Sequence, residues 1–165
     1  MSAVYGKVLV TGSLAFDHIM DFPGRFSDHI LPDKIHILNV SFLVNKMRKQ
    51  WGGTAGNIAY NLALLGESPT VLSSAGRDFG SYRQHLLRSK VDTAEIRQYK
   101  SDATSTFFVV TDTDDNQLAG FYLGVMEKAR LLSIKKVKKR ISLVIPSGAV
   151  SPVKIDSPTS AKPTA

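Results

Sequence analysis

The stretch Trp51 to Gly66, which reads WGGTAGNIAYNLALLG, places a pair of glycines directly before a segment with helical periodicity. Gly52 and Gly53 carry no side chain, so the backbone there can take positive φ and a bound molecule can approach the main chain closely. Both are properties of a binding loop. A glycine-rich turn that only leads into a core helix has the same pattern, so the glycine pair leaves both interpretations open.

The segment after the glycines has the pattern of an amphipathic helix. We expect Thr54 to cap this helix and Gly66 to end it, since hydroxyls accept bonds from first-turn amides and glycine tolerates the left-handed conformation. Asn57 falls in the first turn, where its amide and the unpaired backbone N–H groups can face a ligand. The expected inward residues are large apolar side chains and a stripe of alanines: Ile58, Leu62 and Leu65, with Ala55, Ala59 and Ala63.

Apolar, β-branched runs on both sides of this helix predict a strand, a helix and a strand in succession. The runs are Lys7 to Thr11 (KVLVT) and Thr70 to Ser74 (TVLSS). This spacing indicates a parallel sheet and hence an α/β fold. A second helix is expected at Ser81 to Ser89, after the loop Gly76 to Gly80 (GRDFG).

One aspartate follows the first predicted strand at a position that suits a ligand. Residues 13–21 (SLAFDHIMD) continue as an extended segment, in which Ser13 and Asp17 share a face because alternate residues of a strand point the same way. Asp17 is therefore a candidate for binding substrate hydroxyls. An ordinary turn or surface aspartate is the alternative.

Two further regions have strand patterns. Residues 36–44 (HILNVSFLV) alternate imperfectly and predict a strand outside the main sheet, whereas residues 104–111 and 117–123 predict a hairpin. Its turn, residues 112–116, is acidic, but it lacks the glycine and the glutamate that a calcium loop requires at its sixth and twelfth positions. We interpret it as a solvated hairpin turn.

The last part of the chain changes in composition. Residues 127–142 have helical propensity and contain the basic run KKVKKR. We interpret this run as a solvated helix face, with a surface for an acidic or nucleic-acid partner as the alternative. Residues 143–145 suit one more strand. Residues 146–165 are dominated by Ser, Pro, Thr, Ala and Lys and are expected to form a disordered tail, because they bury too little apolar surface.

Composition excludes several classes of protein. The 165 residues, 43% hydrophobic and 21% charged, suit one domain or part of a larger one. The absence of cysteine excludes disulfides, thiolate metal sites and a cysteine nucleophile. The four histidines are scattered without a metal-binding spacing. No apolar run approaches the ~20 residues of a membrane span, so we expect a cytoplasmic protein without a membrane partner.

The net charge of +7 comes from one segment. Residues 1–128 hold 13 basic and 13 acidic residues, whereas residues 129–165 hold eight basic residues and one acidic residue. A protein that binds nucleic acid in a groove usually carries its positive charge on the folded domain. A nucleic-acid partner is therefore not expected.

Several blocks taken together resemble one family, the ribokinase-like (PfkB) carbohydrate and nucleoside kinases. In chain order the blocks are GSLAFDHIMD, WGGTAGNIAYNLALLG, SSAGRDFG and TSTFFVVTDTDDNQLAGFYLG, and the resemblance runs from about Val8 to Val144. The acidic hairpin and the FYLG segment look closest to the adenosine or nucleoside kinase branch. Ribose and fructose kinases remain alternatives.

The resemblance implies transfer of a phosphoryl group from ATP·Mg²⁺ to a hydroxyl of a sugar or nucleoside. It implies a parallel sheet flanked by helices, and a small β lid, formed by about residues 17–48 and 104–123, that closes over substrate and can mediate a homodimer. The residues expected to bind substrate are Ser13, Asp17, Gly52, Gly53, Thr54 and Asn57, and those expected in the lid are Thr106, Phe107 and Tyr122.

The chain also departs from the family pattern. The family's catalytic aspartate, in a GAGD-like motif, and most of its ATP site belong to the C-terminal half, and this chain contains no G-x-G-D string. Ala15 stands where many ribokinases carry an asparagine. We therefore expect residues 1–145 to be the N-terminal portion of a kinase domain, without a catalytic residue or a metal site and without activity alone. A fragment that binds a sugar or nucleoside without turnover is the alternative.

Overall fold

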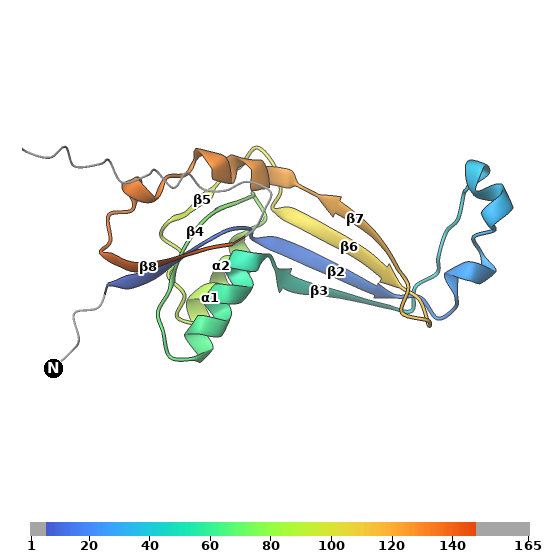
Figure 1. The fold of residues 1–165 in the computed structure, drawn as a ribbon, viewed down its shortest axis with the longest axis horizontal. Helices are drawn as coiled ribbons and strands as arrows, with labels where there is room; N and C mark the ends of the chain where they lie inside the picture. Colours follow the sequence, from blue (N-terminus) through green and yellow to red (C-terminus); the bar gives the residue numbers. More distant parts are fainter. Residues whose placement is uncertain (1–5, 148–165) are drawn as a thin grey trace, which may run out of the picture.

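The computed structural model describes residues 6–147, which form two four-stranded sheets (Figure 1). The first sheet is parallel, with strand order β5-β4-β1-β8. Its strands are β1 (Lys7–Thr11), β4 (Thr70–Ala75), β5 (Ile96–Gln98) and β8 (Ile141–Pro146). The predicted α/β fold, a parallel sheet flanked by helices, is confirmed.

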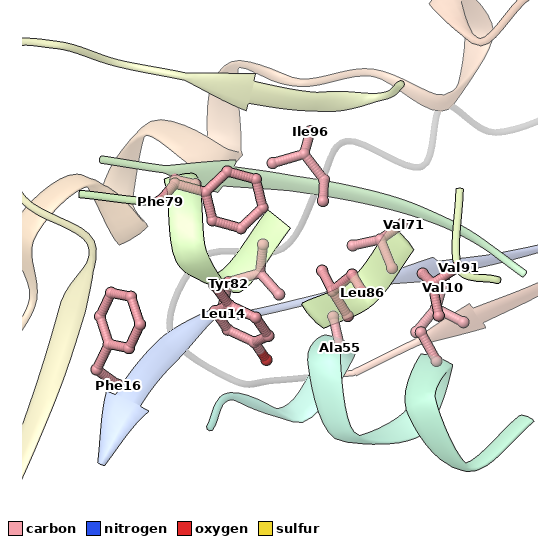
Figure 2. Close-up of a cluster of buried hydrophobic side chains, with 12 residues drawn as sticks. Val10, Leu14, Phe16, Ala55, Val71, Phe79, Tyr82, Leu86, Val91 and Ile96 are labelled. Atoms are coloured by element: carbon pink, nitrogen blue, oxygen red, sulfur yellow. The ribbon is translucent and has the colours of Figure 1, made fainter. Parts of the chain in front are cut away.

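Two helices lie together on one side of the parallel sheet (Figure 1): α1 (Thr54–Leu64) and α2 (Gly80–Arg88). The side chains between helices and sheet form the main core, part of which Figure 2 shows. Alternate strand residues face opposite sides, so Leu9 and Leu72 pack in a second cluster with Leu132. The core residues labelled in Figure 2 are Val10, Leu14, Phe16, Ala55, Val71, Phe79, Tyr82, Leu86, Val91 and Ile96.

The second sheet extends away from this body (Figure 1) and has strand order β3-β2-β6-β7. Its strands are β2 (Ala15–Asp21), β3 (Lys46–Gly52), β6 (Ser105–Thr111) and β7 (Gln117–Tyr122). β2 pairs antiparallel with β3 and parallel with β6, and β6 and β7 form the predicted hairpin. These strands overlap the segments that we expected in a lid.

The start of α1 differs from the prediction. The cap position is Gly53, with φ of 88°, and Thr54 is the first helical residue without a side-chain cap bond, so the prediction of a Thr54 cap is wrong. The end was predicted correctly, since Gly66 has φ of 95° just beyond the helix. Leu65, which we expected to face inward, is 82% exposed because the helix has already ended.

The predicted strand at residues 36–44 is wrong. The chain forms 3-10 helices at Phe26–Asp28 and Pro32–Ile37, and the strand follows later, at Lys46–Gly52. The physical reason is that β3 pairs with β2 on a largely exposed sheet, where the polar run KMRKQ is tolerated without an apolar face.

The predicted helix at residues 127–142 is also wrong. The chain forms 3-10 helices at Gly124–Leu131 and Ile134–Lys136, then enters β8. Pairing of β8 with β1 in the parallel sheet overrides the helical propensity of the basic run. The strand at residues 143–145 was predicted correctly. Most of the expected tail, from residue 148, lies outside the described residues.

The acidic turn closes the β6–β7 hairpin as predicted, but Asp112 is buried rather than solvated. Its carboxylate accepts hydrogen bonds from the backbone N–H groups of Phe26, Asp114 and Asn116 at 2.8–2.9 Å. Burial acts to raise the pKa of Asp112, but these bonds together with that from the Asn116 side chain outweigh it and lower the pKa. The turn therefore holds the segment at Phe26 against the hairpin.

Candidate functional site

The connection between β1 and β2 contacts the glycine loop that precedes α1. The Ser13 hydroxyl accepts a hydrogen bond from the Thr54 backbone N–H at 3.0 Å and lies 3.1 Å from the Thr54 hydroxyl. The Ser13 carbonyl accepts a bond from the Ala55 N–H at 3.0 Å. Ser13 thus satisfies two of the first-turn amides that a cap residue would otherwise bind.

The two glycines are required for different reasons. Gly53 has positive φ, and a Cβ there would lie 2.6 Å from the Ser13 carbonyl oxygen. Gly52 ends β3, and a Cβ there would collide with the carboxyl group of Asp17. The structure therefore brings together Ser13, Asp17, Gly52, Gly53 and Thr54, five of the residues that we expected to bind substrate.

Asp17 presents a half-buried carboxyl group without a partner. Burial raises its pKa, and the positive charge of His18 offsets this only in part. None of the described residues donates a hydrogen bond to the carboxyl group. A ligand that donates hydroxyl hydrogens to Asp17 would stabilise the ionised form. The carboxylate oxygens of Asp17 are therefore free to accept charge-assisted hydrogen bonds from a ligand.

Tyr82, on α2, supports the glycine loop. Its hydroxyl donates a hydrogen bond to the Gly52 carbonyl oxygen at 2.7 Å, and its side chain is 1% exposed. Burial, with the negative charge of Asp17 as the second cause, raises the pKa of Tyr82 well above its ordinary value. The hydroxyl therefore stays protonated and remains a donor.

The GRDFG loop joins the parallel sheet to the second sheet. Asp78 accepts hydrogen bonds from both the backbone N–H and the hydroxyl of Thr104 at 2.7 Å, just before β6. The same hydroxyl also lies within hydrogen-bonding distance, 2.9 Å, of the Gly76 N–H. A Cβ at Gly76 would collide with the backbone of Ala103 and Thr104. The motif was noted in the sequence, but this anchoring role could not be deduced without knowing that β6 starts beside it.

The remaining predicted residues occupy different surroundings. Phe107 is the β6 partner of Asp17 and lies on the same face of the sheet. Thr106 and Tyr122 pair with each other on the opposite face, and the Tyr122 hydroxyl donates to Asp102 at 2.6 Å. The second sheet therefore separates Thr106 and Tyr122 from Asp17.

Asn57 lies beside a pocket of about 330 Å³ between α1, α2 and β3. The pocket includes a stack of aromatic rings, in which Trp51 and His85 have ring centroids 5.2 Å apart at an interplanar angle of 17°. The other residues of its wall are Lys49, Gln50, Gly56, Tyr60 and Tyr82.

Within residues 6–147, no group of three or more His, Asp or Glu side chains is arranged to hold a metal ion. In the same part of the chain no helix is long and apolar enough to span a membrane.

A parallel sheet with helices beside it, joined to a second sheet at a glycine loop and an aspartate, is the architecture of a ribokinase-like protein. Residues 10–156 match the pfkB family of carbohydrate kinases, and the chain belongs to that family. The family resemblance seen in the sequence is thereby confirmed.

The chain is similar to nucleoside kinases of the family. It is 34% identical over 119 residues to the nucleoside kinase of Methanothermobacter thermautotrophicus, which covers 71% of this chain and 35% of that protein. The structure of Burkholderia thailandensis nucleoside kinase in complex with inosine matches with a TM-score of 0.71 and 34% identity, covering 86% of this chain and 44% of that one.

A third match is the nucleoside kinase of Methanocaldococcus jannaschii, an archaeal member of the ribokinase family, with a TM-score of 0.62 and 27% identity over 74% of this chain and 38% of that one. The chain thus spans less than half the length of these relatives.

Proposed function

We propose that this chain forms the nucleoside-binding portion of an ATP-dependent kinase that phosphorylates a nucleoside hydroxyl. The observation that carries the proposal is the unpartnered carboxyl group of Asp17, held against Gly52 beside the loop from Ser13 to Thr54. A ribose ring offers two adjacent hydroxyl donors, which suit one carboxylate with two acceptor oxygens.

In this proposal each residue has a binding role. Asp17 accepts hydrogen bonds from the sugar hydroxyls, Gly52 and Gly53 allow the sugar close to the main chain, and Asn57 binds from the first turn of α1. Ser13 and Thr54 hold the loop in place. Phe107, on the face of Asp17, would cover the sugar if the second sheet acts as a lid, and exclusion of water would then strengthen the hydrogen bonds.

Support for a nucleoside over a free sugar comes from relatives. Burkholderia thailandensis nucleoside kinase was solved with inosine and with ADP-inosine. An adenosine-type substrate and ATP as donor are therefore our proposal for this chain, with ribose or fructose as the alternative acceptors.

Calorimetry with inosine, adenosine and ribose tests the binding role of Asp17. We expect Asp17→Asn to weaken nucleoside binding at least tenfold, about 1.4 kcal/mol. The matched control is Asp21→Asn, because Asp21 lies on the same face of β2 and pairs with Arg48 at 3.1 Å. Equal affinity of wild type and Asp17→Asn would remove Asp17 from the site, and tighter binding of ribose than of nucleosides would favour a sugar kinase.

We further propose that the chain alone binds its substrate without phosphorylating it, since it contains no G-x-G-D string. Incubation with ATP, Mg²⁺ and adenosine or inosine should then give no product above background. Turnover at a rate ordinary for kinases, roughly 1–100 s⁻¹, would contradict this proposal.

We also propose that the second sheet mediates a homodimer. Several of its large apolar side chains are 42–49% exposed, namely Phe108, Leu118, Phe121 and Tyr122. Light scattering should give twice the mass of 18.0 kDa, and a monomer at micromolar concentration would contradict the proposal.

A further inference from the structure

We infer that Tyr82 is a positioning residue for substrate binding: its hydroxyl orients the Gly52–Gly53 peptide so that the Gly53 N–H faces the substrate. The inference rests on the proposed function and adds to it a residue that lies in the core, on α2, and does not itself touch substrate. Three observations carry it.

The first observation is the hydrogen bond itself. The Tyr82 hydroxyl donates to the Gly52 carbonyl oxygen at 2.7 Å from a side chain that is 1% exposed. The ring is packed between neighbouring rings, with centroids 5.2 Å from Trp51 and 5.8 Å from both Phe16 and Phe79. A ring confined in this way cannot swing its hydroxyl elsewhere, so the donor has one position.

The second observation is the space reserved for this hydroxyl. A Cβ at Gly56, in the first turn of α1, would collide with the Tyr82 hydroxyl oxygen. Glycine inside a helix costs about 0.5–1 kcal/mol relative to alanine. Gly56 has an ordinary helical position and needs no positive φ. Its physical role is therefore to let the hydroxyl pass α1 and reach the glycine loop.

The third observation concerns the peptide between the two glycines. A trans peptide is planar, so its C=O and N–H groups point in opposite directions. With the Gly52 carbonyl held toward Tyr82 in the core, the Gly53 N–H points away from the core. Among the described residues no acceptor binds the Gly53 N–H, whereas the next two amides, of Thr54 and Ala55, are both bound by Ser13.

The Gly53 N–H is therefore a hydrogen-bond donor that already faces the site before a ligand binds. Glycine pairs are free to rotate their shared peptide, and rotation would turn the N–H away from the site. Tyr82 prevents this rotation before the substrate arrives. Removal of the Tyr82 hydroxyl should therefore weaken substrate binding, because the Gly52–Gly53 peptide would then have to be ordered when the substrate binds. The substrate would lose no direct contact with the ring.

The test uses Tyr82→Phe in the full chain, which keeps the ring and removes only the hydroxyl. The matched control is Tyr99→Phe, because the Tyr99 hydroxyl is also buried and has no hydrogen-bond partner in the described part of the chain. We expect the backbone amide resonance of Gly53 in ¹⁵N–¹H spectra of the free protein to shift in Tyr82→Phe and to stay in place in Tyr99→Phe. Inosine affinity should fall about fivefold or more in Tyr82→Phe only.

A second variant keeps the test decisive if Tyr82→Phe folds poorly. Gly56→Ala leaves the hydroxyl in the chain but pushes it from the Gly52 carbonyl, so it should also shift the Gly53 amide resonance and weaken inosine binding. An unchanged Gly53 resonance in both variants overturns the inference. If the wild-type chain binds no nucleoside but the Gly53 amide resonance still shifts in both variants, the proposed function fails. The inference that Tyr82 orients the Gly52–Gly53 peptide would then still hold.

Discussion

The two sheets of this protein differ in how they are stabilised. Every residue of β4 in the parallel sheet is buried, whereas every residue of β7 in the second sheet is exposed. The parallel sheet is stable because both of its faces are covered, by α1 and α2 on one side and by the 3-10 segment near Leu132 on the other. The second sheet depends on ladder pairing and on a few contacts at its base, chiefly Asp78 with Thr104.

The difference explains where the candidate site lies. The candidate site lies where the buried body meets the second sheet: Ser13 follows β1 and Thr54 begins α1, whereas Gly52 ends β3. Asp17 belongs to the less buried sheet, and the glycine loop leads from that sheet into α1.

The largest effect that would test this contrast is expected from truncating one leucine in each region. Leu86→Ala removes a side chain with 0% exposure from the core under α2 and should cost about 3 kcal/mol of unfolding free energy. Leu118→Ala, in β7, removes a side chain that is 44% exposed and should cost less than about 0.5 kcal/mol. Urea denaturation measures both, and equal losses would show that the second sheet is as tightly packed as the first.

A smaller effect is expected at the joint between the sheets. Gly76→Ala places a Cβ against the backbone of Ala103 and Thr104 and should destabilise the protein by about 2 kcal/mol. The control is Gly80→Ala, where the added Cβ meets no atom within 4 Å at the start of α2 and should be neutral or slightly stabilising. If Gly76→Ala proved as harmless as the control, the joint would not be the rigid contact that we describe.

The smallest effect is expected in how the unfolding free energy depends on acid pH, through Asp92, which pairs with Thr70 of β4. Burial acts to raise the pKa of Asp92, but hydrogen bonds from Lys139, the Ala94 N–H and Thr70 outweigh it and lower the pKa. The stabilisation is fully present above the unfolded-state pKa of about 3.9 and is lost as pH falls through the lower folded-state pKa. Below about pH 4, unfolding free energy should therefore fall less steeply in Asp92→Asn than in wild type.

Titration of unfolding by urea at several pH values, followed by circular dichroism, checks this slope. The exposed Asp33→Asn serves as the control and should keep the wild-type slope. An unchanged slope in Asp92→Asn would mean that Asp92 gains nothing from its hydrogen bonds in the folded state.

The elements of the parallel sheet could be predicted from sequence because burial on both faces leaves a strong local pattern. The strand KVLVT, the strand TVLSS and the helix between them all appeared where expected. The errors fall in exposed or edge regions. The polar strand KMRKQWG forms because β2 offers an edge with which it can pair. The basic run near Lys135 forms no α-helix beyond a short 3-10 turn, because β8 must reach β1.

The sequence by itself therefore determined the α/β fold, the family, and the identity of Asp17 and the glycine pair as candidates for a binding site. The fold and the candidate residues follow from local spacing and the family from the resemblance of its motifs, all of which one chain displays directly. Only the tertiary structure decided which groups a side chain at each glycine would meet. It alone brought the Tyr82 hydroxyl to the Gly52 carbonyl oxygen and the Asp78 carboxylate to the Thr104 N–H. Such contacts join residues that are far apart in sequence, and no local pattern records which backbone atom a distant side chain will meet.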